Sequence, residues 1–215
     1  MKKIGILGSG IVAQTLGNGF LKNNYEVMLS SRNQAKLLDW QKAGGKNAHL
    51  GSFYEAGKFG DIVVLALKGS IAVEAIEDAG PQHLMRKTVI DTTNPIMEGS
   101  APENGVLRFF TNFDESLMER LQTQFPEVHF VKAFSCVGNA NMVNPDFKEK
   151  PTMFICGNND FSKKEVSEIL EQFGWDIADM GKATAARAIE PLSMLWCIPG
   201  MLNNEWNHAF RLMKG

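Results

Sequence analysis

The sequence predicts an α/β fold built on a doubly wound parallel sheet, with a small C-terminal α/β lobe and terminal helices. Apolar, strand-like runs alternate with amphipathic helical stretches through the first two-thirds of the 215 residues, which is typical of a parallel sheet covered by helices. A glycine-rich turn, Gly8-Ser9-Gly10, directly follows the first apolar run and opens the first helix. Strand, glycine turn and helix in this order are the start of a βαβ unit.

The N-terminal half is expected to hold five strands connected by helices. The strands are predicted at residues 3–7, 25–30, 48–50, 61–67 and 88–91, and the helices at 11–22, 34–42, 52–58 and 71–78. The run from Ile62 to Leu67 is the clearest buried strand, because it is apolar without interruption. A long irregular stretch rich in Asn, Gly and Pro then leads to a helix at 114–125 and a sixth strand at 128–134.

The sequence pattern changes after residue 141. We expect a strand at 152–156, a helix at 162–173 and a strand at 175–180, followed by a helical region rich in Met, Leu and Trp from residue 183 to the end. The predicted division is therefore a nucleotide-binding domain of Rossmann type at residues 1–140 and a smaller lobe at residues 141–215.

Composition excludes several classes of partner. The chain is 44% hydrophobic and 21% charged, with a net charge of −2 and no cluster of basic residues, so neither nucleic acid nor a membrane surface is expected as a partner. No apolar stretch approaches the roughly 20 residues needed to cross a bilayer. Cys136, Cys156 and Cys197 have neither paired nor metal-ligand spacing, which favours reduced thiols and a cytoplasmic location.

The turn at residues 8–12 has the spacing of a dinucleotide site. Gly8 can adopt a backbone conformation closed to residues with a Cβ, and Gly10 lets a pyrophosphate approach the main chain. The following helix begins at Ile11 and Val12, where free N–H groups and the helix dipole favour an anion. A second strand at βαβ distance supports the same interpretation.

The end of the second strand indicates which dinucleotide binds. Ser31 and Arg32 stand where proteins that bind NAD usually place an acidic residue, and Lys36 follows four positions after Arg32. A guanidinium can hold a 2′-phosphate with two charge-assisted bonds. The sequence therefore predicts NADP as the cofactor, although two ordinary surface cations at a solvated helix start would have the same pattern.

Ligands of an open parallel sheet bind beyond the carboxyl ends of its strands. Three further strand ends should therefore meet the glycine turn: Ala66-Leu67-Lys68, Thr92-Thr93-Asn94-Pro95 and Ser135 to Asn139.

Asn94 follows the fifth strand next to Pro95, whose ring fixes the backbone. Its amide could bond the nicotinamide carboxamide or ribose, or alternatively its own backbone in a turn. Val73, on the helix after the fourth strand, could contact the adenine or simply pack in the core.

No pattern of catalytic side chains is present. The four histidines are scattered, the chain lacks a Ser/His/Asp order and a Tyr-x-x-x-Lys pair, and His208 is expected on a helix surface. Alcohol oxidation normally needs a positioned proton acceptor. Hydride transfer between two stacked rings mainly needs proximity in a dry slot. Ring-to-ring transfer without a catalytic side chain is therefore the favoured chemistry.

Together these motifs resemble the deazaflavin (coenzyme F420)-dependent NADP oxidoreductases, including the related NADPH domains of membrane ferric reductases. The matching segments span most of the chain and are Gly8-Ser9-Gly10, Ser31-Arg32 with Lys36, 61–67, 89–95, 132–134, 154–157 and 189–192. Lys68 departs from the family, which commonly has proline there, and places a cation near the pyrophosphate.

The resemblance implies that NADP lies across the strand ends and that the acceptor ring stacks on the nicotinamide, beside the C-terminal lobe. It implies NADP contacts from residues 9–12, Ser31, Arg32, Lys36 and Val73, and a contact from Asn139 at the nicotinamide end. Trp206 would lie on a C-terminal helix lining the acceptor slot; from the residues alone it is equally a core or dimer residue.

The leading hypothesis is an NADP(H)-dependent oxidoreductase that passes hydride to a flavin-like or other small acceptor, with deazaflavin, FMN and FAD left open. A pyrroline-carboxylate-type imine reductase is a second hypothesis, against which the strand-helix-strand pattern after residue 150 argues. A non-catalytic NADP(H) sensor is the third. A homodimer formed through the Met- and Trp-rich terminal helices is also expected.

Overall fold

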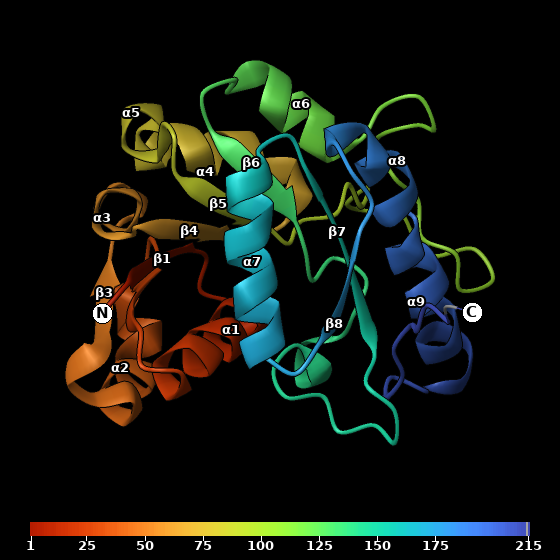
Figure 1. Ribbon diagram of the computed structural model, residues 1–215, viewed down its shortest axis with the longest axis horizontal. Coiled ribbons are helices and arrows are strands. Elements are labelled where there is room, and N and C mark those ends of the chain that lie inside the picture. Colours follow the sequence, from red (N-terminus) through yellow and green to blue (C-terminus); the bar gives the residue numbers. More distant parts are fainter. Residues whose placement is uncertain (214) are drawn as a thin grey trace.

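The computed structural model describes residues 1–213 and 215, and a single mixed sheet forms its centre (Figure 1). Its strands are β1 (Lys3–Leu7), β2 (Glu26–Ser30), β3 (Ala48–Gly51), β4 (Ile62–Leu65), β5 (Thr88–Asp91), β6 (His129–Lys132), β7 (Thr152–Gly157) and β8 (Asp176–Asp179). They lie in the order β3-β2-β1-β4-β5-β6-β7-β8. β1 to β6 pair in parallel, β7 pairs antiparallel with β6, and β8 is parallel to β7. The predicted α/β fold is confirmed.

Helices cover both faces of the sheet. They are α1 (Ile11–Lys22), α2 (Leu38–Gly44), α3 (Phe53–Phe59), α4 (Ala72–Ala79), α5 (Pro81–Leu84), α6 (Leu117–Gln124), α7 (Asp160–Gln172), α8 (Ala186–Ile189) and α9 (Leu192–Asn203). α1, α2 and α7 pack in the core on one face, and α3 to α6 with α8 pack in the core on the other. Both faces are buried, which explains the uninterrupted apolar run of β4.

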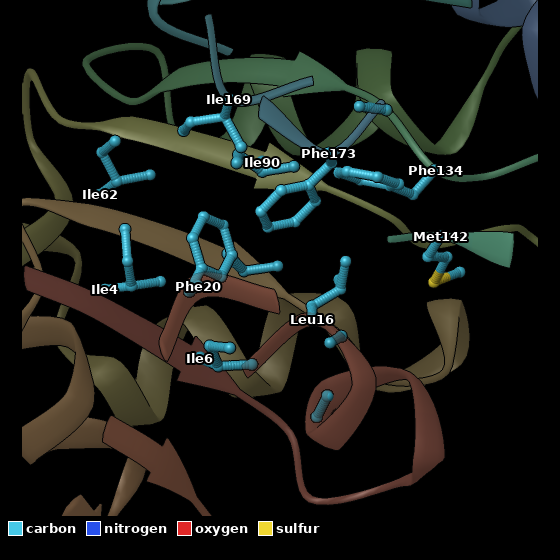
Figure 2. Close-up of a cluster of buried hydrophobic side chains, with 14 of the residues drawn as sticks. Ile4, Ile6, Leu16, Phe20, Ile62, Ile90, Phe134, Met142, Ile169 and Phe173 are labelled. Carbon is cyan, nitrogen blue, oxygen red and sulfur yellow. The ribbon is translucent and has the colours of Figure 1, made fainter. Parts of the chain in front are cut away.

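The core that contains α1, α2 and α7 extends along the sheet to the carboxyl edge of its parallel strands. The ring of Phe20 in α1 packs against that of Phe173 in a tilted arrangement, with centroids 5.0 Å apart, and the Phe173 and Phe134 centroids are 6.2 Å apart. Figure 2 shows Phe134 and Met142 at the end of this row of side chains. Both residues are buried and also line the cavity described below. The wall of the site is therefore an extension of the core.

The C-terminal part continues the sheet. β7 pairs with β6, and Val166, Ile169 and Leu170 of α7 lie in the same core as α1. Residue 140, where the sequence predicted a boundary, precedes the change from parallel to antiparallel pairing. The division into two domains stays a prediction.

One predicted helix is too long. The structure has α8 and α9 after residue 183, but residues 204–213 are not helical. Asn204 ends α9 in the left-handed conformation, with φ of 58°. The chain then folds back so that the Trp206 ring lies against Gly200, where an added Cβ would come within 2.2 Å of it. The prediction that Trp206 lies on a C-terminal helix is therefore wrong.

Among the described residues, no helix combines the length and the apolar composition needed to cross a bilayer.

Candidate functional site

A cavity of about 620 Å³ opens at the carboxyl edge of the parallel strands. The ends of β1, β4, β5 and β6 all contribute residues to its wall, as expected for an open parallel sheet. The predicted site residues that line it are Gly10, Ile11, Val12, Ala66, Leu67, Lys68 and Asn94. The structure thus brings four separate segments of the predicted site into one cavity.

The glycine turn needs its two glycines for different reasons. Gly8 has φ of +145°, and a Cβ there would lie 2.1 Å from the backbone oxygen of Ala66. Gly8 therefore lets β1 and β4 approach each other at the edge of the sheet. A Cβ on Gly10 would meet no atom within 4 Å, so this glycine leaves space for a ligand beside the main chain.

Gly10 is also the N-cap of α1 and provides no side-chain cap. The first N–H groups of this 12-residue helix are therefore without a capping partner, and Ile11 and Val12 line the cavity. An uncapped helix start with a partial positive charge is suited to a phosphate.

Two cations lie at the end of β2, outside this cavity. Arg32 and Lys36 are both exposed, and neither side chain has an ion pair or hydrogen bond with the residues that the structure describes. The hydroxyl of Ser31 accepts from the Asn33 N–H at 3.0 Å, and Asn33 in turn caps the 3-10 helix at Gln34–Leu37. The turn is thus ordered by its own hydrogen bonds, which leaves the two cationic side chains for a ligand.

Two residues of the cavity wall, Asn94 and Ser135, carry unsatisfied polar atoms. Asn94 donates its amide N–H to the Ser135 backbone oxygen at 2.7 Å, so the alternative that it bonds its own backbone is wrong. Asn94 Oδ1 and Ser135 Oγ are buried without a hydrogen-bond partner among the described residues. Buried polar atoms are usually paired. One atom is an acceptor and the other belongs to a hydroxyl, and a carboxamide group has a donor and an acceptor to match these two types.

Phe134 precedes Ser135 and has an unusual backbone. Its φ is 61°, a left-handed conformation that is rare for a bulky residue. Such conformations cost about 1–3 kcal/mol and cluster at ligand sites. No local pattern predicts this feature, because Phe has no preference for a left-handed turn.

A buried ionic cluster holds the strand ends that carry these groups. Lys132 Nζ lies 2.7 Å from Asp91 Oδ2 and 2.9 Å from Glu190 Oε1, and it donates to the backbone oxygen of Thr93 at 2.9 Å. All three charged side chains are at most 2% exposed. Burial alone would lower the pKa of Lys132, but the two carboxylates outweigh it and raise this pKa above its ordinary value.

The cluster also connects distant segments. Glu190 accepts from two backbone N–H groups at the start of α6, both at 3.0 Å. Asp91 Oδ1 accepts from the backbone and the hydroxyl of Thr93. The cluster thereby connects the end of α8 and the start of α6 to the ends of β5 and β6. Asn94 and Ser135 follow these two strand ends in the chain.

The charged side chains at the cavity wall form one contact. Lys68 Nζ lies 3.2 Å from Glu98 Oε2, and Ser70 donates its hydroxyl to Glu98 Oε1 at 2.6 Å. The Ser70 hydrogen bond, followed by that from Lys68, holds the pKa of the Glu98 carboxyl below its ordinary value. The sequence analysis assigned Lys68 but missed Glu98, which lies in the irregular stretch after β5.

The remaining predicted residues lie around this cavity but do not line it. Val73 packs against the core that contains α3 to α6 and α8. Asn139 is the first residue of a 3-10 helix at Asn139–Asn141. Trp206 is 39% exposed and lies 5.6 Å from Trp196, whose ring packs against Gly138. The predicted residues outside the lining are Gly8, Ser9, Ser31, Arg32, Lys36, Val73, Pro95, Asn139 and Trp206.

His208 was predicted to lie on a helix surface, and this prediction is wrong. The residue lies after the end of α9 and packs against that helix. Its Nε2 lies 2.8 Å from the Trp196 backbone oxygen, and Trp196 Nε1 donates to the His208 backbone oxygen at 2.9 Å. The two rings are stacked, with centroids 4.9 Å apart. These contacts hold the C-terminal segment against α9.

Comparison with known proteins agrees with this geometry. Residues 3–95 match the family model of coenzyme F420-dependent NADP oxidoreductases. The F420-dependent NADP reductase of Methanocaldococcus jannaschii is 27% identical over 204 residues, covering 90% of each chain. The metalloreductase STEAP3 of Rattus norvegicus is 26% identical over 208 residues, or 93% of this chain. The chain spans only 39% of that metalloreductase.

Solved structures extend the likeness to the whole chain. A protein of Arthrobacter sp. FB24, provisionally described as an F420-dependent NADP reductase, superposes with a TM-score of 0.92 at 27% identity over 100% of both chains. An imine reductase of Myxococcus stipitatus in complex with NADP+ shares the fold alone, with a TM-score of 0.69 at 18% identity, covering 95% of this chain and 63% of that one. The predicted resemblance to the coenzyme F420-dependent NADP oxidoreductases is confirmed.

Proposed function

We propose that this NADP-dependent oxidoreductase transfers hydride between the nicotinamide and a flavin-like or other small acceptor by direct stacking of the two rings. The observation that carries the proposal is the cavity itself. The uncapped start of α1 lines it together with Asn94 and Ser135, each of which has a buried polar atom without a partner among the described residues. A nicotinamide dinucleotide has phosphates that match the helix start and a carboxamide that matches the polar atoms of Asn94 and Ser135.

The residues present fit NADP at its adenosine end. Arg32 and Lys36 would hold the 2′-phosphate, and the Ser31 hydroxyl would donate to it after turning away from the Asn33 backbone oxygen, to which it donates at 3.0 Å in the free protein. The open space beside Gly10 and the start of α1 would accept the pyrophosphate. Val73 would contact the adenine. These assignments are proposals that follow from exposure, charge and position at the strand ends.

The nicotinamide end is assigned by its hydrogen-bonding groups. Asn94 Oδ1 would accept from the carboxamide NH₂, and Ser135 would donate its hydroxyl to the carboxamide oxygen. The Asn94 amide is held in this orientation by its own bond to the Ser135 backbone. Asn139, after the same strand, would contribute near the ribose.

The walls around this end favour hydride transfer without proton transfer. Phe134, Val137 and Met142 are buried and apolar, so they exclude water from the reacting carbons. When bound, NADPH supplies the hydride, and the protein contributes alignment in a dry slot. No side chain is proposed as a proton donor or acceptor.

The acceptor is proposed to be a deazaflavin, because the M. jannaschii relative is an F420-dependent reductase. FMN and FAD are the alternatives to compare. Trp206 is proposed as an acceptor contact; reaching the acceptor from its position behind Trp196 requires the C-terminal segment to move or the acceptor to extend past Gly138.

We also propose a homodimer and a cytoplasmic location. α9 carries no charged residue, and Leu195, Met201 and Leu202 are between 43% and 59% exposed on it. A second copy of this apolar helix would cover these side chains. Light scattering at micromolar concentration should give twice the monomer mass, and a monomer would contradict the dimer. Fractionation of the native cells should recover the protein with the cytoplasm.

Anaerobic stopped-flow absorbance tests the proposed reaction. Mixing the protein and NADPH with a deazaflavin should give loss of NADPH absorbance with matching reduction of the acceptor, and FMN and FAD provide the comparison. Stoichiometric NADPH binding without absorbance loss at any acceptor concentration would favour the sensor hypothesis. NADPH oxidation with a cyclic imine and none of these rings would favour the imine reductase.

A further inference from the structure

The cavity wall has a simple charge arrangement. Among the described residues that line it, Lys68 is the only cation and Glu98 the only anion. Their charged atoms are 3.2 Å apart. Lys68 comes from the end of β4, close to the glycine turn, whereas Glu98 comes from the irregular segment between β5 and α6. The one cation available to a ligand in this cavity is therefore already engaged by a carboxylate.

The position of the Glu98 carboxylate is determined from two sides. Its segment is a short hairpin-like loop, in which the Met97 N–H donates to the Arg108 backbone oxygen and the Phe110 N–H donates to the Pro95 oxygen, both at 2.8 Å. On the other side, Ser70 donates its hydroxyl to the same carboxylate at 2.6 Å. Glu98 thus bridges the loop to the end of β4 across the cavity wall.

The contact between Lys68 and Glu98 is easily broken. Their side chains are 72% and 49% exposed, and exposed ion pairs contribute little to stability. Ser70 can keep the carboxylate in place after the lysine has left. A second anion arriving near α1 can therefore take Lys68 from Glu98 at small energetic cost.

We propose that Glu98 limits the affinity for the cofactor, by holding Lys68 in the free enzyme and by repelling the pyrophosphate in the complex. Binding then moves the Lys68 ammonium from the carboxylate to the pyrophosphate. This inference rests on the proposed function, because it takes the ligand to be a dinucleotide. The effect of Glu98 on affinity should be the same for NADPH and NADH, because the 2′-phosphate would lie at Arg32, outside the cavity.

Calorimetric titration of NADPH and NADH into Glu98→Gln tests the proposal. The glutamine keeps an acceptor for Ser70 but removes the charge. Affinity should increase by about three- to fivefold, the range of a single exposed charge contact, and by the same factor for both nucleotides. Glu103→Gln is the matched control, because Glu103 lies in the same loop, pairs with Arg108 and does not line the cavity. It removes the same charge and should change affinity less than twofold.

Lys68→Met shows whether Glu98 acts through the lysine. The single variant Lys68→Met should weaken the binding of NADPH and of NADH by equal factors. Glu98→Gln added to Lys68→Met should then strengthen binding by a clearly smaller factor than in the wild type. Unfolding midpoints should change little in all these variants, because the positions are exposed.

The outcomes separate the inference from the proposed function. Wild-type protein that binds NADPH, with Glu98→Gln unchanged, weakened or no different from Glu103→Gln, would overturn the role of Glu98 alone. An equal gain in Glu98→Gln with and without Lys68 would overturn the exchange of partners. Wild-type protein that binds neither nucleotide would overturn the proposed function, and the inference with it.

Discussion

The two ends of the cavity are constructed differently. The phosphate end depends on local sequence, because the glycine turn of residues 8–10 and the start of α1 lie within a few residues of each other. The nicotinamide end depends on distant partners, since Asn94 bonds Ser135 and Lys132 pairs with Glu190 across 58 residues. The matched family model covers residues 3–95 and thus includes the whole local part. The proposed phosphate site is therefore encoded locally, whereas the proposed nicotinamide site is a product of tertiary structure.

The largest expected effect concerns the distant cluster. Lys132→Met would leave the carboxylates of Asp91 and Glu190 buried without their cation, so it should destabilise the protein by about 3–5 kcal/mol. Denaturant unfolding at pH 7 measures this loss. A loss below about 1 kcal/mol would show that the cluster does not hold the strand ends together.

The pH dependence of this loss has a definite sign. The carboxylates raise the pKa of Lys132 in the folded state above the ordinary 10.5. The stabilisation is therefore fully present below pH 10.5 and lost only as pH rises through the higher folded value. The difference in stability between wild type and Lys132→Met should therefore not shrink between pH 7 and pH 9.

The second effect concerns the local turn and uses its two glycines as a matched pair. Gly8→Ala should destabilise the protein by about 2–4 kcal/mol, because the Cβ would meet the Ala66 backbone at a positive φ. Gly10→Ala should leave stability within about 0.5 kcal/mol but weaken NADPH binding. Thermal unfolding and calorimetry measure the two effects, and equal stability losses would contradict the separate roles.

These two regions also explain how much of the structure was predictable. The turn, the strand order of the first βαβ unit and the buried β4 follow from local patterns that composition and spacing reveal. Lys132 looks like an ordinary residue at a strand end, and only the fold brings Asp91 and Glu190 to it. Ser135 and Glu98 likewise gained their significance from partners far along the chain.

The C-terminal error has a physical cause as well. The charge-free run after residue 191 favours a helix, and α9 does form there despite Pro199. The left-handed Asn204 and the fit of Trp206 against Gly200 then end it, and both depend on packing. Antiparallel pairing of β7 with β6 could not be predicted either, because the strand sequence does not indicate direction.

The third effect is a test of cofactor choice. Arg32→Ala should weaken NADPH binding by about 1.5–3 kcal/mol, the range of a charge-assisted contact, and leave NADH nearly unchanged. Calorimetric titration with both nucleotides measures the change in affinity. Arg86→Ala is the surface control, because Arg86 precedes β5, at the edge of the sheet opposite the carboxyl ends of the strands. Equal losses for the two nucleotides would count against the 2′-phosphate assignment.

The smallest expected effect is at the nicotinamide end. Ser135→Ala removes one unpartnered hydroxyl, so it should weaken NADPH by about 0.5–1.5 kcal/mol, as for one neutral hydrogen bond. The hydroxyl has no hydrogen-bond partner among the residues that the structure describes, so unfolding stability should be unchanged or slightly increased. A loss of stability with unchanged NADPH affinity would assign Ser135 to the core.

The cavity and the two exposed cations at the end of β2 are proposed to hold, together, a dinucleotide whose adenosine ribose carries a phosphate. Calorimetric titration of the wild-type protein with NADPH and with NADH tests this proposal most directly. We expect NADPH to bind at least about tenfold more tightly than NADH, equivalent to about 1.4 kcal/mol. Equal affinities would contradict the role given to Arg32 and Lys36, and absence of binding by both would contradict the site itself.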